Sequence, residues 1–108
     1  MNTELQKCIE LCRECVTACE KCYTECLDAP DVQERTECLQ LVRDCADICV
    51  LTARFMARQS EFSTELHQVC ASICEACAEE CAKFDDEACQ QCAEICRQCA
   101  LQCRQMAS

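Results

Sequence analysis

The chain has no glycine, no tryptophan and a single proline, Pro30, in its 108 residues. Tight hairpins, phosphate-binding loops and dinucleotide-binding folds need glycine where other residues are strained. The lack of glycine therefore argues against these structures and leaves helices as the expected elements. One tyrosine and three phenylalanines are also too few to fill the core of an ordinary globular enzyme.

The chain also lacks an excess of positive charge and a long apolar run. Twenty Asp and Glu against ten Lys and Arg give a net charge of −10, so nucleic acid is not expected as a partner. No stretch approaches the roughly 18 apolar residues of a membrane span. Residues 1–6 carry neither the basic nor the apolar part of a signal peptide. The sequence predicts a soluble, cytoplasmic protein with no membrane partner.

Cysteine is what the chain has in abundance, at 18 of 108 residues. Cytoplasmic thiols are kept reduced, so this density favours metal ligation over a disulfide framework. A disulfide framework would be expected only if an export signal had been removed. With so few other large apolar residues, the core is expected to be largely sulfur.

The cysteines recur with helical spacing. Gaps of 4, 3, 4, 3 and 4 in residues 8–26 form a heptad seam, and similar runs cover residues 70–81 and 89–103, with a sparser one in 38–49. Each run places its thiols on one stripe of one helix. The full set is Cys8, Cys12, Cys15, Cys19, Cys22, Cys26, Cys38, Cys45, Cys49, Cys70, Cys74, Cys77, Cys81, Cys89, Cys92, Cys96, Cys99 and Cys103.

Breaks between the runs define the first two helices. The first is expected over residues 3–28, because the ring of Pro30 disfavours a helical residue before it. Asp31 with Glu34 resembles a capping box, which would open a second helix running to about residue 58.

Two further helices follow. Ser60 or Ser63 is expected to cap a third helix ending near residue 83, and Asp85 or Asp86 a fourth that continues almost to the last residue. Connections this short make neighbouring helices antiparallel. The predicted fold is all-α, an up-down-up-down antiparallel four-helix bundle with a cysteine-lined core, forming a single domain over residues 1–108.

The register follows from the turns, because facing residues of an antiparallel pair have a constant sum of numbers. Turns near residues 30, 59 and 85 predict three layers of four cysteines: Cys12, Cys49, Cys70 and Cys99; Cys15, Cys45, Cys74 and Cys96; and Cys22, Cys38, Cys81 and Cys89. Another layer combines Cys19, Val42, Cys77 and Cys92, Cys26 lies beyond the last layer, and the opposite end holds Cys8, Thr52, His67 and Cys103. Every cysteine is thus expected inside the bundle.

One or two buried thiols would be ordinary packing, but eighteen indicate selection for sulfur, since Leu or Ala would fill a core without the risk of oxidation. Thiolates select Cu(I), Zn(II) or iron–sulfur clusters. Four thiolates around one Zn(II) carry a net charge of −2, and stacking such layers in a dry core is unfavourable. Cu(I) can approach one ion per thiolate and leave the core near neutral. The pattern favours several Cu(I) ions per chain.

The alternatives are a structural bundle that binds Zn(II) or iron–sulfur clusters and a thiol enzyme. The ferredoxin cysteine run lies in a loop and ends in proline, unlike the runs here. Five C-x2-C pairs occur, mostly in mid-helix, where no helix N-terminus would lower the pKa of one thiol. No catalytic residue stands out, and an enzyme is not expected.

Together these runs make the chain resemble the cytosolic bacterial copper storage proteins. The resemblance rests on the C-x3-C-x2-C-x3-C-x2-C-x3-C run of residues 8–26, the sparser 38–49 run, the run from His67 to Cys81 and the closing 89–103 run, and covers essentially the whole chain. It implies a homotetramer of four-helix bundles that stores Cu(I) on its thiolates for copper homeostasis and detoxification. The chain departs from the pattern in having a single histidine and Val42 at a seam position.

Soft ligands other than cysteine gather at one end of the predicted bundle. The two termini and the turn near residue 59 share that end, where the cysteine stripes continue into Met56, His67 and Met106. We expect His67 to bind Cu(I) together with Cys8 or Cys103, and this end to admit copper.

Apolar side chains mark two other places. The opposite end of the bundle is expected to be closed by an apolar plug of Tyr23, Leu27 and Phe84. The second helix also carries an apolar stripe that one bundle would partly expose, formed by Leu41, Ile48 and Phe55 with Leu51 beside it. With the family resemblance, this stripe predicts a homo-oligomer, a tetramer.

Overall fold

The computed structural model describes residues 2–108, so Met1, the first residue of the predicted domain, lies outside the described residues. Four helices account for most of it: α1 (Thr3–Asp28), α2 (Thr36–Ala57), α3 (Ser63–Cys81) and α4 (Glu87–Ala107), with a short 3-10 helix, η1 (Val32–Arg35), before α2. Residues 2–108 contain no strand, which confirms the all-α class. No helix among these residues is both long enough and apolar enough to span a membrane.

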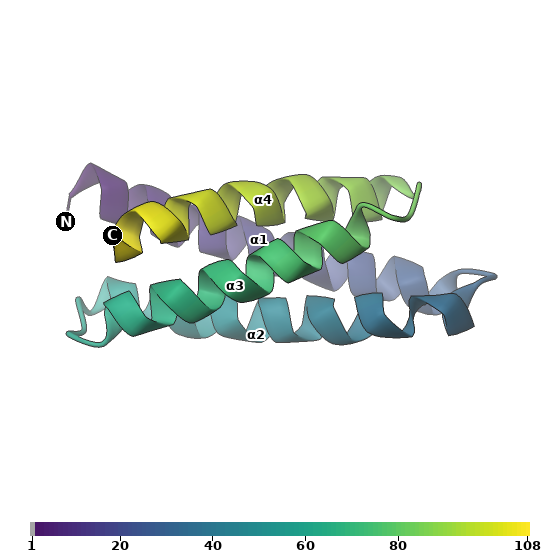
Figure 1. The fold of residues 1–108 in the computed structure, drawn as a ribbon, viewed down its shortest axis with the longest axis horizontal. Helices are drawn as coiled ribbons and strands as arrows, with labels where there is room; N and C mark the ends of the chain where they lie inside the picture. Colours follow the sequence, from purple (N-terminus) through teal and green to yellow (C-terminus); the bar gives the residue numbers. More distant parts are fainter. Residues whose placement is uncertain (1) are drawn as a thin grey trace.

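The helices lie side by side in alternating directions (Figure 1). Each helix packs against two neighbours, α1 against α2 and α4, and α3 against the same two. The bundle measures 44 × 19 × 19 Å. Both termini and the α2–α3 connection lie at one end, here called the terminal end, and the other two connections lie at the far end (Figure 1). The predicted up-down-up-down four-helix bundle is confirmed.

The bounds of α1 agree with the expectation from proline. The helix begins after Asn2, whose side-chain oxygen accepts a hydrogen bond from the backbone N–H of Leu5 at 2.7 Å. It ends at Asp28, and Ala29 adopts an extended conformation with φ −72° and ψ 143° before Pro30.

Within residues 2–108 no side chain caps α2, α3 or α4 by a hydrogen bond, although Asp86 occupies the N-cap position of α4 as predicted. Asp31 does not open α2: its carboxylate accepts a hydrogen bond from Nε of Arg35 at 2.9 Å, and the chain first forms η1. The hydroxyl of Ser60 accepts from the backbone N–H of Phe62 at 3.1 Å, outside α3. Asp86 stands at the start of α4, but its carboxylate also binds Arg35. A buried charge attracts these carboxylates more strongly than a backbone N–H does.

The end of α2 shows how a chain without glycine makes a tight helix stop. Gln59 takes the left-handed conformation with φ 52°, which glycine occupies at most such positions. Its N–H donates to the carbonyl of Met56 at 2.9 Å, and the N–H of Ser60 donates to that of Phe55 at 3.0 Å. These two bonds form a Schellman motif, which starts the turn toward α3.

Replacing Gln59 with glycine should therefore stabilise the metal-free protein. The left-handed conformation costs a residue with a Cβ about 1–2 kcal/mol, partly offset by the greater freedom of glycine in the unfolded chain. We expect Gln59→Gly to raise the free energy of unfolding by about 0.5–1 kcal/mol in urea titrations under reducing conditions. The matched control Gln40→Gly, at an exposed position inside α2, should lower it by about 1 kcal/mol. Equal effects of the two substitutions would contradict this explanation.

Candidate metal centre

The interior of the bundle is built from sulfur. All 18 cysteines are free thiols and all are fully buried, each with 0% of its surface exposed. Ile9, Val42, Met56 and several alanines complete the core. The heptad spacing turns every cysteine of a helix toward the bundle axis, so four stripes of thiols face one another.

The structure brings together the three layers predicted from the register. In every layer α1 faces α4 and α2 faces α3. The Sγ–Sγ distances are 3.7 Å for Cys12–Cys99 and Cys49–Cys70, 3.5 and 3.6 Å for Cys15–Cys96 and Cys45–Cys74, and 3.4 and 3.7 Å for Cys22–Cys89 and Cys38–Cys81.

The layers are not separate sites, because sulfur contacts also run along the axis. Cys49 lies 3.8 Å from Cys74 of the next layer, and Cys92 lies 3.8 Å from both Cys96 and Cys19. Sets of four sulfurs whose members all lie within 4.8 Å of one another share members, as do Cys12, Cys49, Cys70, Cys99 and Cys15, Cys49, Cys74, Cys99. The core is therefore a continuous column of sulfur in which no set of four is marked off from the next.

The terminal end holds the predicted mixture of ligands. Cys8 and Cys103 lie 3.9 Å apart, and His67, 2% exposed, is close enough to Cys8 to influence its ionisation. Contacts with Cys103 lower the pKa of the Cys8 thiol, and His67 acts in the same direction. Nδ1 of His67 is buried and has no hydrogen-bond partner among residues 2–108. A buried, unpaired imidazole nitrogen beside thiols is chemically suited to bind a soft metal ion.

The two methionines of the terminal end differ in burial. Met56 is fully buried in the core, whereas Met106 is partly buried and packs against it. Thr52, placed by the register in the same layer as His67, donates its hydroxyl to the carbonyl of Ile48 at 2.7 Å. Because that hydroxyl is already hydrogen-bonded within its own helix, the predicted layer contains three side chains suited to a soft metal: Cys8, His67 and Cys103.

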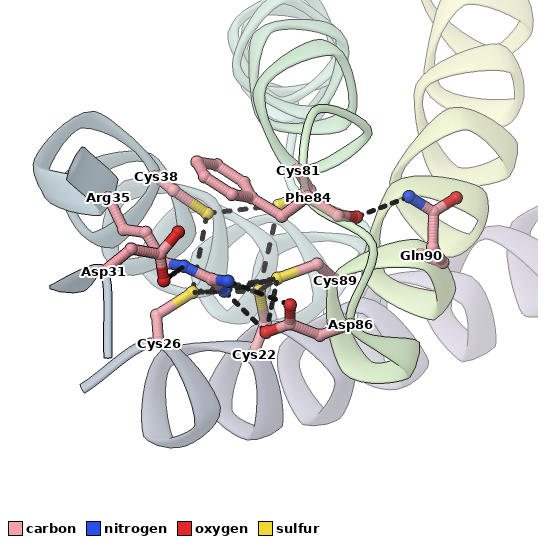
Figure 2. Close-up of polar contacts among 10 residues, drawn as sticks. All are labelled: Cys22, Cys26, Asp31, Arg35, Cys38, Cys81, Phe84, Asp86, Cys89 and Gln90. Atoms are coloured by element: carbon pink, nitrogen blue, oxygen red, sulfur yellow. Dashed lines mark hydrogen bonds and ion pairs between the residues drawn. The ribbon is translucent and has the colours of Figure 1, made fainter. Parts of the chain in front are cut away.

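The predicted apolar plug at the far end is wrong. Leu27 is 51% exposed, and Tyr23 lies beneath the guanidinium of Arg43, 4.2 Å from its ring centre. Tyr23 and Phe84 are both partly buried against the core, and Phe84 also packs against Arg35, whose guanidinium carbon lies 4.5 Å from the centre of the Phe84 ring. A buried ion pair closes the far end instead (Figure 2).

Arg35 is the centre of this ion pair and is only 6% exposed. Its Nη1 and Nη2 donate to the two carboxylate oxygens of Asp86 at 2.5 and 2.9 Å. Nη1 also lies 3.6 Å from Sγ of Cys26 and 3.7 Å from Sγ of Cys89. Arg35 was not among the site residues predicted from the sequence. Its position was a usable signal, because Arg35 precedes Cys38 by three residues and so extends the seam of α2.

Cys26, expected beyond the last layer, joins it, lying 3.9 Å from Cys38 and 3.7 Å from Cys89. The far-end group therefore contains five sulfurs: Cys22, Cys26, Cys38, Cys81 and Cys89 (Figure 2). Burial raises the pKa of Cys26, and it raises that of Cys89 to about 12. In the absence of metal these two are neutral thiols that fit a dry interior.

The donor set defines the chemistry of this core. Thiolate sulfur binds soft ions such as Cu(I) and Zn(II), and carboxylate oxygen suits harder ones. Asp86 is the carboxylate that approaches the sulfur column, with its oxygen 3.9 Å from Sγ of Cys89. Both oxygens of this carboxylate already accept hydrogen bonds from Arg35. The one histidine of the chain, His67, lies beside Cys8, but both side chains are buried, as is every other thiol of the column. The arrangement is suited to holding many soft ions rather than to transforming a substrate.

Comparisons with known proteins agree with this chemistry. Residues 1–108 match a family model described as copper storage protein. The fold is similar to that of the Cu(I)-bound copper storage protein BsCsp3, with a TM-score of 0.94 and 44% identity over 98% of this chain and 100% of that one. A cytosolic copper storage protein from Streptomyces lividans, solved with five coppers, gives a TM-score of 0.93 and 36% identity over 96% and 92% of the two chains.

A further similarity is to the cysteine-rich protein YhjQ of Bacillus subtilis, which is 46% identical over 70 residues. This match spans 65% of each chain, just under two thirds of the length of YhjQ.

Proposed function

The chain belongs to the copper storage protein family, and from that premise we propose that it stores and buffers Cu(I) in the cytoplasm for copper homeostasis and detoxification. The observation that carries the proposal is the continuous column of 18 buried, reduced sulfurs. A cytoplasmic location is supported by the Streptomyces lividans relative, which is a cytosolic copper storage protein. The family role is storage, which agrees with a core whose thiols are all fully buried.

We propose that residues 1–108 act as one Cu(I)-binding domain in which all 18 cysteines and His67 are ligands. The sulfur–sulfur contacts in the core range from 3.4 to 4.0 Å. One ion can therefore bridge thiolates of two helices or of adjacent layers. Cu(I) is satisfied by two or three soft ligands, so a column without closed tetrahedral sets suits it. One monovalent ion per thiolate would also leave this dry core near neutral.

Zn(II) and iron–sulfur clusters fit the same column less well. Structural zinc sites are closed sets of four ligands, whereas Cys49 and Cys99 each belong to two overlapping sets. Four thiolates per Zn(II) would repeat a net charge of −2 along the axis. Iron–sulfur ligands usually come from irregular loops, and here all 18 cysteines lie on helices.

Titration of the reduced, metal-free protein with Cu(I) and with Zn(II) under anaerobic conditions tests the proposal. We expect Cu(I) uptake to saturate near one ion per cysteine, because each thiolate can share in binding a monovalent ion. Metal content after removal of loosely bound ions and competition with a Cu(I) chelator measure this directly. Saturation at about four or five Zn(II), with no greater uptake of copper, would point to a structural zinc protein.

We propose that copper reaches the column at the terminal end, where His67 binds it together with Cys8 or Cys103. The support comes from the unpaired Nδ1 of His67 and the lowered pKa of Cys8. Cys8 and Cys103 are the cysteines nearest to the two termini, so an ion that arrives at this end meets their sulfurs first. Exchange between neighbouring sulfurs then carries copper toward the far end.

His67→Ala should slow copper uptake or slightly lower the number of ions bound, while the deeper layers still fill. The control is Gln68→Ala, at the exposed neighbouring position of α3, which should behave like the unaltered protein. Stopped-flow uptake from a Cu(I) donor and metal content at saturation are the measurements. If both variants match the unaltered protein in rate and capacity, His67 is a structural residue.

We further propose that the chain forms a homotetramer, as the family resemblance implies. Leu41 and Ile48 of the predicted stripe are partly buried against their own core, so they contribute less free surface than expected. Leu51 stays 42% exposed and lines a shallow groove between α2 and α3 with Ile48 and Ile73. This apolar groove supports an interface on the α2–α3 side.

Light scattering at micromolar concentration should therefore give a mass four times that of one chain. Leu51→Glu places a charge in the groove and should lower that mass, because an unpaired charge is costly at an apolar interface. Leu27→Glu, at an exposed apolar residue of α1, is the matched control and should leave the mass unchanged. A mass equal to that of a single chain for the unaltered protein would contradict the proposed tetramer.

A further inference from the structure

Arg35 is the only lysine or arginine that is buried among residues 2–108. A positive charge in a protein interior is costly unless it is paired, and the core proposed to hold copper is the place where this one is buried. The guanidinium lies beside the far-end group and directs Nη1 toward two of its five sulfurs, Cys26 and Cys89 (Figure 2).

The position of Arg35 is fixed from several sides. Asp31 holds Nε, Asp86 holds Nη1 and Nη2, and the ring of Phe84 packs against the guanidinium plane. The hydrogen bonds to Asp86 raise the pKa of Arg35 further above its ordinary value, so the charge is permanent. The side chains of the two carboxylates are 39% and 27% exposed for Asp31 and Asp86, whereas that of Arg35 is 7% exposed. Water therefore screens the negative partners more than it screens the guanidinium facing the sulfurs.

We propose that Arg35 acts as a built-in counter-ion of the copper store. Its guanidinium compensates thiolate charge in the far-end group, so that this group binds fewer Cu(I) ions than it has thiolates and still retains them tightly. The proposal rests on the proposed storage of Cu(I).

The charge balance gives the reason. Five thiolates carry five negative charges, and each bound Cu(I) cancels one of them. A sulfur that accepts a hydrogen bond from a guanidinium keeps part of its negative charge at low cost. Cys26 and Cys89 are the sulfurs so placed, and both belong to the last layer, at the end of the column. Elsewhere in the described column no guanidinium approaches the thiols, so neutrality there depends on copper alone.

A simpler explanation is that Arg35 and Asp86 only seal the far end mechanically. Under that explanation the ion pair itself matters, and removing either partner opens the end in the same way. If Arg35 is a counter-ion, the two partners have opposite effects, because removing the negative charge of Asp86 leaves more positive potential at the sulfurs.

The test compares copper retention in Arg35→Gln and Asp86→Asn under increasing chelator concentration. We expect Arg35→Gln to release part of its copper at about tenfold lower chelator activity, the scale of one lost hydrogen bond to a charged group. Asp86→Asn, in which Asp31 still holds Nε, should retain copper as well as or better than the unaltered protein. Arg43→Gln, which alters an exposed Arg that stacks on Tyr23, should match the unaltered protein.

Two results would overturn the proposal. Unchanged retention in Arg35→Gln would show that the charge is not used, and equal losses in Arg35→Gln and Asp86→Asn would show a mechanical seal. Circular dichroism of the metal-free variants checks the fold. Should Arg35→Gln not fold, Arg35→Lys takes its place: it keeps the charge, so a tenfold loss of retention in that variant would also contradict a counter-ion. Failure of the unaltered protein to take up Cu(I) would instead reject storage itself.

Discussion

The structure depends on one property of the cysteine side chain, which is apolar and uncharged as a thiol and a soft anionic ligand as a thiolate. In the thiol form, 18 of these side chains pack at the centre of a bundle and are fully buried. A core of carboxylates or imidazoles could also bind metal, but the bundle would not pack around these polar groups in the absence of metal. Heptad spacing on all four helices then aligns the same side chains in one column.

Charge is the second constraint, since every thiolate formed inside the column adds a negative charge to a dry interior. Monovalent copper removes that charge ion by ion, and the guanidinium of Arg35 supplies a fixed positive charge at the far end. The two ends of the bundle consequently differ in chemistry. At the terminal end the buried imidazole of His67 lies beside Cys8, whose Sγ contacts that of Cys103, whereas Asp86 and Phe84 fix a cation against Cys26 and Cys89 at the far end.

Much of the fold was predictable because it repeats. The 4-3 spacing of the cysteines specifies helices, Pro30 marks the end of α1, and the antiparallel sums place Cys12, Cys49, Cys70 and Cys99 in one layer, as the structure has them. The caps were not predictable by the same means. Asp31 and Asp86 have the right residue type for capping, but both carboxylates bind the guanidinium of Arg35, and a local sequence pattern does not reveal that contact.

The sequence by itself therefore determined the helices, their order, the register and the chemical nature of the interior, because each depends on spacing along the chain or on residue type. Only the tertiary structure decided how the ends are built. Leu27 is exposed while Arg35 is buried, against their ordinary preferences, because Asp31 from the α1–α2 connection and Phe84 and Asp86 from the α3–α4 connection converge on Arg35. The burial of a charged group depends on partners far apart in sequence, and their meeting is a property of the folded bundle alone.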